Sequence, residues 1–164
     1  MPRVELVVAS RDHLDAYEAG PEALGRMLDA EVTDGWVLYP EWLRKALGAV
    51  DPSEGDEWGT HLFLLADPRT LVGWGGFKGE PRDGVVEIGY EVAASVQGRG
   101  IATAAAAAMI AKAEAAGVQS VTAHTLREHN ASCRVLEKNG FRLVDEEAVD
   151  GDRQAWLWRL ELAG

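Results

Sequence analysis

Cysteine is almost absent from the 164-residue chain: Cys133 is the only one, so the chain can form no internal disulfide. This composition is typical of proteins from a reducing compartment. No secretory signal is expected near the start, because Glu5 interrupts what would be its apolar segment. The longest weakly apolar stretch, residues 101–111, is far shorter than the roughly 20 residues that cross a bilayer. We therefore expect a cytoplasmic protein with no membrane-embedded part.

Positive charge is also scarce, since 16 Lys and Arg stand against 27 Asp and Glu and the formal net charge is −11. The basic residues form no cluster, whereas a nucleic-acid-binding surface needs concentrated positive charge to neutralise phosphates. We expect no nucleic-acid partner, and the acidic balance is compatible with a cationic acceptor substrate. The four histidines, His13, His61, His124 and His129, show no metal-ligand spacing, so no metal site is expected.

Internal repeats and linkers are missing as well. A chain of 164 residues with 47% hydrophobic content can bury one sizeable core but has no room for a second catalytic domain. We therefore expect residues 1–164 to form a single domain. The oligomeric state is open at this stage, and a homodimer is one of the alternatives.

Apolar periodicity and turn residues predict the order of the elements. Strands are expected at residues 4–8, 60–66, 71–77, 85–92, 118–124, 141–146 and 154–162. Helices are expected at residues 21–31, 40–50, 101–116 and 130–139, and Ser10 is a candidate cap for one more. The three central strands should form an antiparallel meander. This order predicts an α/β fold in which a mixed, mostly antiparallel sheet carries helices on both faces.

A glycine-rich turn, Gln97-Gly98-Arg99-Gly100-Ile101-Ala102, follows the strand that ends at Val92 and opens a helix. Such a turn presents backbone N–H groups at the positive end of a helix dipole, which suits a pyrophosphate. Gly98 and Gly100 have no Cβ atoms to block close approach, and Arg99 can add a charge-assisted bond. A plain strand-to-helix turn explains this segment equally well. No Walker-type phosphate loop occurs, and the acid of a dinucleotide fingerprint is missing, since His124 and Thr125 stand near its place.

Two motifs resemble those of the GNAT acetyltransferases. The turn from Gln97 to Ala102 is similar to their Gln/Arg-x-x-Gly-x-Gly/Ala pyrophosphate motif. The segment from Asn130 to Phe141 resembles the family's Asn-x-x-Ser-x-x-x-Leu-Glu-Lys-x-Gly-Phe helix, with Ser132 one place early. The residues Val86-Glu87-Ile88-Gly89-Tyr90 are similar to the fourth strand of the branch that acetylates ribosomal-protein N-termini. One departure is Leu136, which stands where many relatives carry a tyrosine as general acid.

The resemblance implies a GNAT fold and acetyl-CoA as co-substrate. The strand around Val92 should splay from its neighbour and bind the pantetheine arm, and Gln97, Gly98, Arg99, Gly100, Ile101 and Ala102 should hold the pyrophosphate. Asn130 should both cap its helix and contact the pantetheine. Ser132 should face the CoA sulfur as a proton donor or hydrogen-bond partner, although a local backbone bond is an equal alternative. A backbone N–H near Glu91 or Val92 is implied as the oxyanion donor.

The strand at residues 85–92 carries the candidates for a general base. Its alternation places Val86, Ile88, Tyr90 and Val92 on an apolar face and leaves Glu87 and Glu91 on the other, toward the expected acceptor cleft. A primary amine near pKa 10.4 is almost wholly protonated at neutral pH, so a base is useful. Glu87 is favoured over Glu91, because a bulge near Gly89 could turn Glu91 aside. Both glutamates could instead be solvated side chains.

The sequence leaves three alternatives for the function. The leading one is an N-acetyltransferase that joins an acetyl group to a primary amine in a ternary complex, with a small molecule or a protein N-terminus as acceptor. The second, motivated by Leu136, is a non-catalytic sensor that binds acyl-CoA, and the third is a nucleotide-binding module. Trp36, Tyr39 and Trp42 lie where the family forms its acceptor site, and core packing is favoured for them over a pocket.

Overall fold

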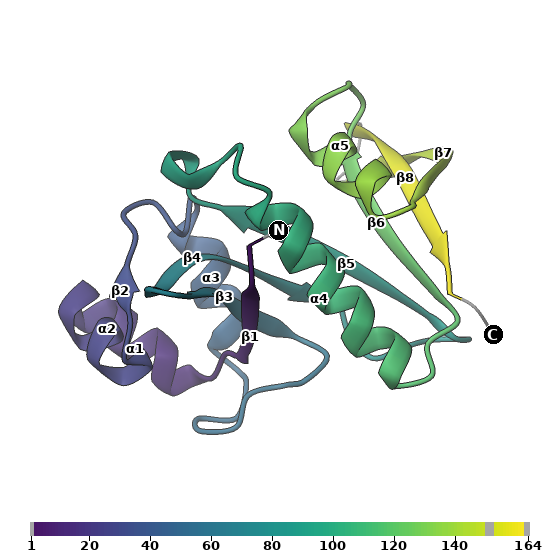
Figure 1. Ribbon diagram of the computed structural model, residues 1–164. Coiled ribbons are helices and arrows are strands. Elements are labelled where there is room, and N and C mark those ends of the chain that lie inside the picture. The colour runs from purple at the N-terminus through teal and green to yellow at the C-terminus, as the bar shows by residue number, and fades with distance from the viewer. Residues whose placement is uncertain (1, 150–152, 163–164) are drawn as a thin grey trace.

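The elements of the chain follow the predicted alternation of strands and helices (Figure 1). The computed structural model describes residues 2–149 and 153–162. Along the chain, the elements are β1 (Val4–Val8), α1 (Arg11–Ala19), α2 (Pro21–Leu28), β2 (Glu31–Val32), α3 (Pro40–Leu47), β3 (Thr60–Ala66), β4 (Arg69–Phe77), β5 (Val85–Val92), the 3-10 turn η1 (Ala94–Val96), α4 (Ile101–Ala115), β6 (Ser120–Leu126), α5 (Ala131–Lys138), β7 (Arg142–Val149) and β8 (Arg153–Glu161).

The strands form one mixed sheet in the order β1-β3-β4-β5-β6-β8-β7, with the short β2 beside β4. Among the described strands, the β5–β6 and β2–β4 pairs are parallel and the others antiparallel. The central β3-β4-β5 meander and the mostly antiparallel sheet are therefore confirmed. Parallel strands need a crossover connection, and α4 supplies it between β5 and β6.

Strand β3 shows how one sheet supports a core on each face. Phe63 is fully buried in a cluster with residues of α4 and α5, including Met109. Its neighbours Leu62 and Leu64 point the other way and join a second cluster with Leu43 and other residues from α1 to α3. Helix α4 contacts β1 and β5 and crosses the front of the sheet in Figure 1. The prediction of helices on both faces is confirmed.

Several boundaries differ from the sequence-based ranges. Helix α2 ends at Leu28, three residues earlier than expected, because Asp29 adopts a left-handed conformation with φ of 51° that terminates the helix. The chain then turns into β2, which was not predicted and pairs with only two residues of β4. Strand β4 begins at Arg69, two residues earlier than expected, because the turn before it is short.

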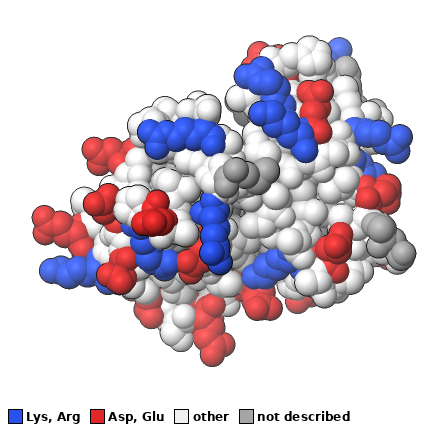
Figure 2. All heavy atoms as spheres, in the orientation of Figure 1, with Lys and Arg blue, Asp and Glu red and all other residues white. Residues whose placement is uncertain are grey.

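Charged side chains of both signs are interspersed on the face shown in Figure 2. Acidic side chains are frequent toward the N-terminal helices at the left of this view. Lys and Arg side chains border the hollow that lies between the start of α4 and α5. Other Lys and Arg side chains are scattered over this face among acidic ones, so it carries no broad basic surface. In the described part of the chain, no helix has both the length and the apolarity to cross a membrane.

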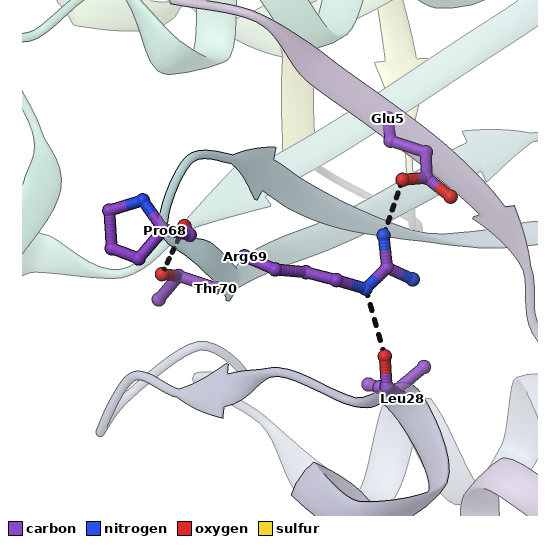
Figure 3. Close-up of polar contacts among 5 residues, drawn as sticks. All are labelled: Glu5, Leu28, Pro68, Arg69 and Thr70. Carbon is purple, nitrogen blue, oxygen red and sulfur yellow. Dashed lines mark hydrogen bonds and ion pairs between the residues drawn. The ribbon is translucent and has the colours of Figure 1, made fainter.

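Arg69 links three elements of the N-terminal half (Figure 3). Its Nε donates to the carbonyl oxygen of Leu28 at the end of α2 over 2.9 Å, and its Nη1 donates to the Glu5 carboxylate on β1. Because the Leu28 carbonyl lies in the last turn of its helix, it has no partner within the helix and accepts the guanidinium hydrogen. Arg69 thus holds the end of α2 against the edge of the sheet.

The sheet opens between β5 and β6. These strands pair only over Val85, Val86 and Glu87. Farther along, β5 continues to Val92 beside β4, whereas β6 continues to Leu126 beside β8. Figure 1 shows the two strands diverging from their shared end at the lower right. The predicted splay near Val92 is therefore present, and beyond Glu87, toward the C-terminal end of β5, it separates the sheet into two halves.

Candidate functional site

A cavity of about 480 Å³ lies where β5 has left β6, between the start of α4 and the face of α5. Most residues predicted for the site line it, namely Glu91, Val92, Gln97, Gly98, Gly100, Ile101, Ala102 and Ser132. The structure thus brings together the end of β5, the glycine-rich turn and the first turn of α5. Glu87, Arg99 and Asn130, which were also predicted, are not part of the cavity wall.

The glycine-rich turn forms one end of the cavity. Gly98 and Gly100 have φ values of 83° and 77°, in the left-handed region that favours glycine. A Cβ on Gly98 would meet no atom within 4 Å, so open space lies beside the turn. The first hydrogen bond of α4 joins the Ala104 N–H to the Gly100 carbonyl, which leaves the N–H groups of the preceding helical residues without helical partners. This turn fits a pyrophosphate.

Basic side chains come from α5 and not from the turn. Arg99, Arg134 and Lys138 are all exposed, but only Arg134 and Lys138 line the cavity. Sequence reasoning missed these two residues. Together with Ala131 and Val135 they follow the i, i+3, i+4, i+7 spacing of one helix face, and that spacing could have identified them. Two cations in the cavity wall could add charge-assisted bonds to an anionic ligand.

Asn130 caps α5, as predicted. Its Oδ1 accepts a hydrogen bond from the Cys133 N–H over 3.1 Å, and its backbone is extended as in other N-caps. Cys133 is buried and its Sγ donates to the Glu128 carbonyl oxygen, which fits a packed residue. The cap fixes the first turn of α5 and with it the position of Ser132.

Glu91 lies in the cavity wall near the end of β5. Its Oε2 accepts a hydrogen bond from the backbone N–H of Leu38 over 2.7 Å, and Leu38 also lines the cavity. Burial raises the pKa of the Glu91 carboxyl, and the bond from Leu38 opposes that rise. The β4–β5 register runs without a shift through Gly89, so no bulge turns Glu91 aside.

Glu87 sits where β5 and β6 are still paired. Its Oε2 lies 2.6 Å from Lys78 Nζ and 2.9 Å from His124 Nδ1. Burial would raise the pKa of the Glu87 carboxyl, but the hydrogen bonds from Lys78 and His124 outweigh it and lower the pKa. Alternation along the strand does not distinguish Glu87 from Glu91. The distinction comes from the splay, which opens only beyond Glu87.

Tyr90 reaches from β5 across the splay to α5. Its Oη lies 3.1 Å from Ser132 Oγ and 3.2 Å from the Ser132 carbonyl oxygen. Both residues line the cavity. Burial raises the pKa of Tyr90 to about 12. The sequence placed Tyr90 only on the apolar face of its strand, so this polar contact between distant segments was missed. Leu136, at the position of a tyrosine in many relatives, is fully buried and lies outside the cavity wall.

The three aromatic residues of the N-terminal half have different environments. Trp36 is buried and its ring meets Tyr17 edge to face, as expected of a core residue. Tyr39 and Trp42 were also expected in the core, but half or more of each residue is exposed. Helix α3 buries Leu43 and Leu47 on its inner face, so Trp42 falls on the outer one.

The comparisons with known proteins agree with this geometry. A model of the family described as "Acetyltransferase (GNAT) domain" matches residues 3–142. A solved acetyltransferase from Agrobacterium tumefaciens aligns with a TM-score of 0.64 at 20% identity, over 98% of this chain and 91% of its own. A Bacillus subtilis acetyltransferase in complex with CoA has a TM-score of 0.61 at 18% identity, over 99% and 100% of the two chains. A GNAT-family acetyltransferase from Streptococcus pneumoniae aligns with a TM-score of 0.60 at 17% identity, over 98% of this chain and 100% of its own. A comparison with curated proteins found no match.

The splayed sheet with a glycine-rich turn at the start of α4 is typical of the fold of acyl-CoA-dependent acyltransferases, and the solved structures share this fold. Because the family match spans most of its length, the chain belongs to the GNAT acetyltransferase family.

Proposed function

We propose that this protein transfers an acetyl group from acetyl-CoA to a primary amine in a ternary complex. The observation that carries the proposal is the cavity at the splay, which is lined at one end by the Gly98 and Gly100 turn and at the other by Glu91 and Ser132. One end suits phosphates and the other holds groups that can act on a proton. A cavity of this kind can seat a phosphorylated donor with its reactive end beside an acceptor.

The residues present fit acetyl-CoA. The N–H groups at the start of α4 would bind the pyrophosphate with the turn from Gln97 to Ala102, and Arg134 and Lys138 would add positive charge. Val92 would bind the pantetheine arm. The Ala93 N–H donates to Val72 on β4, so the Val92 N–H points to the opposite edge, where β6 has departed. Acetyl-CoA supplies an activated thioester, and the same Val92 N–H is a candidate oxyanion donor.

Glu91 is the better placed base. Its side chain lies in the cavity wall and the pKa of its carboxyl is raised. Glu87 instead lies outside the wall, where its carboxylate contacts Lys78 and His124. The amine nitrogen bonds to the acetyl carbon and the carbon–sulfur bond breaks, with its electron pair going to sulfur. The amine proton goes to Glu91, directly or through one water. This assignment reverses the preference for Glu87 that the sequence suggested.

The acceptor class follows only from the chemistry of the site and the resemblance. A carboxylate that faces the acceptor favours a cationic amine, as does the net charge of −11. The similarity of residues 86–90 to the N-terminal acetylating branch supports including peptide N-termini beside small amines.

Release of free CoA thiol tests the proposal against the sensor alternative. The protein is incubated with acetyl-CoA and a panel of small amines and peptides with free N-termini. Thiol release that depends on one of the amines, with a matching acetylated product by mass spectrometry, is expected. Binding of acetyl-CoA without amine-dependent release across the panel would favour the sensor, and stabilisation by NAD or ATP but not CoA would favour a nucleotide-binding module.

A further inference from the structure

Departure of the CoA sulfur leaves negative charge that a hydrogen-bond donor can stabilise. Leu136 cannot serve, because it has no donor and is buried away from the cavity. The described residues of the cavity wall carry three hydroxyl groups, those of Tyr90, Thr103 and Ser132. Thr103 lies in the first turn of α4, at the phosphate end. Tyr90 and Ser132 remain at the other end, in contact with each other.

The Tyr90 hydroxyl contacts two oxygens of one residue. It lies 3.2 Å from the Ser132 carbonyl oxygen and 3.1 Å from Ser132 Oγ. A carbonyl oxygen can only accept, so the Tyr90 hydrogen points toward Ser132 in the arrangement that satisfies that contact. Tyr90 has one hydrogen, and when it is shared between these two oxygens the hydrogen on Ser132 Oγ is free to point into the cavity. When Tyr90 gives its hydrogen wholly to the carbonyl oxygen, Ser132 Oγ donates to Tyr90 Oη instead, and loss of the Tyr90 hydroxyl would then not weaken the acidity of a bound thiol.

We propose that Tyr90 is a positioning residue that orients the Ser132 hydroxyl toward the sulfur of the leaving CoA. This inference rests on the proposed function, because it requires CoA in the cavity. Ser132 then donates a hydrogen bond to the sulfur as the carbon–sulfur bond breaks and the electron pair moves to sulfur. The donor pair spans the splay, one member on β5 and one on α5, in place of a tyrosine at position 136.

The acidity of Tyr90 decides between hydrogen bonding and proton transfer. Burial raises the pKa of Tyr90 to about 12, so the phenol keeps its proton at physiological pH. An ordinary thiol has a pKa near 8.5, so full transfer from Tyr90 through Ser132 to the thiolate is unfavourable by a factor of about 10³ to 10⁴. Tyr90 and Ser132 therefore act as hydrogen-bond donors, and the thiolate takes its proton from water on release.

The acidity of the thiol of bound CoA measures this effect without an acceptor. Thiolate absorbance in the ultraviolet is followed against pH for CoA bound to the wild type, Tyr90→Phe, Ser132→Ala and the double variant. Loss of one hydrogen bond to a charged group should weaken the acid dissociation of the bound thiol about tenfold in either single variant. The double variant should equal Ser132→Ala, because Tyr90 acts through the serine hydroxyl.

Two controls separate positioning from a structural role. Desulfo-CoA, which lacks the sulfur, should bind all variants with affinity close to that of the wild type. Tyr17→Phe removes a hydroxyl from a tyrosine that packs on Trp36 in the other core and should leave the thiol acidity unchanged.

The inference is overturned if Tyr90→Phe leaves the thiol acidity unchanged or weakens desulfo-CoA binding as much as CoA binding. It is also overturned if Tyr90→Phe has its full effect in the Ser132→Ala background, because Tyr90 would then act through the Ser132 carbonyl. These outcomes leave the proposed function standing. A wild-type protein that binds no CoA would instead overturn the proposed function and this inference with it.

Discussion

Replacing Glu91 by glutamine separates the proton-accepting role that we propose for it from its structural one. The glutamine side-chain oxygen can still accept the hydrogen bond that the Leu38 N–H donates over 2.7 Å, so the loop that contains Leu38 should stay in place. At pH 7 an amine with a pKa of about 10.4 is deprotonated in only about one molecule in 2,500. A positioned general base contributes about 10²- to 10⁴-fold, so we expect kcat to fall at least about 100-fold while acetyl-CoA affinity stays near that of the wild type.

The pH dependence of the reaction rate gives a second measure of the role proposed for Glu91. In the proposed mechanism the ionised form of Glu91 is the active one, and burial raises the pKa of its carboxyl. Wild-type activity should therefore fall as the pH drops through that raised pKa, above the range of an ordinary glutamate. Glu91→Gln should lack this acidic limb, and its rate should follow the free-amine fraction alone. Steady-state rates across pH with a confirmed acceptor measure both effects.

Glu87→Gln is the matched control, since it makes the same chemical change on the same strand. It disturbs the contacts with Lys78 and His124 outside the cavity wall, so kcat should stay within about threefold of wild type. Loss of activity in Glu87→Gln alone would restore the preference that the sequence suggested. Full activity of both variants at all pH values would remove carboxylate base catalysis from the account.

Two further predictions concern stability. His61 is buried, and burial together with the nearby charge of Lys112 lowers its pKa to about 4. Between pH 6.5 and 4, His61 is therefore protonated in the unfolded chain but stays neutral in the folded one. The unfolding free energy should therefore drop by up to about 3 kcal/mol from pH 6.5 to 4, and urea titrations of His61→Gln should show a flatter profile in that window; equal profiles would contradict this. Asn130→Ala removes the cap on the Cys133 N–H and should lower Tm by roughly 2–4 °C, for a cost of about 1 kcal/mol. Asn130→Asp keeps the acceptor, so equal melting of both variants would refute the cap.

The glycine-rich end of the cavity could be predicted because its signals are local. A strand followed by Gly98 and Gly100 at the start of a helix is a short-range pattern, and the left-handed φ values of both glycines agree with it. The cap by Asn130 is local in the same sense, since it acts three residues away. Alternation along β5 likewise predicted that Val86 and Ile88 are buried.

The opposite end of the cavity, with Glu91 and Ser132, depends on contacts that no local pattern contains. Glu87 and Glu91 are four residues apart on one strand, and only the point at which β6 leaves β5 decides which of them reaches the cavity. Tyr90 contacts Ser132, which lies 42 positions later in the sequence. Alternation along β5 therefore predicted that the ring of Tyr90 lies on an apolar face, but it could not predict the partner of the hydroxyl. Such pairings follow from tertiary packing, which overrides single-strand reasoning.

Binding of acetyl-CoA at the glycine-rich turn is the most direct test of the central claim. Acetyl-CoA at about 100 times its Kd adds about 2.7 kcal/mol, which should raise Tm of the wild type by roughly 5–11 °C. Gly100→Glu sets bulk and negative charge against the phosphates and should abolish this rise. Gly117→Glu is the matched control, because Gly117 has a similar φ of 84° and open space at the far end of α4. The account predicts a full rise for the wild type and Gly117→Glu and none for Gly100→Glu; no rise in the wild type, or an equal rise in all three, would contradict it.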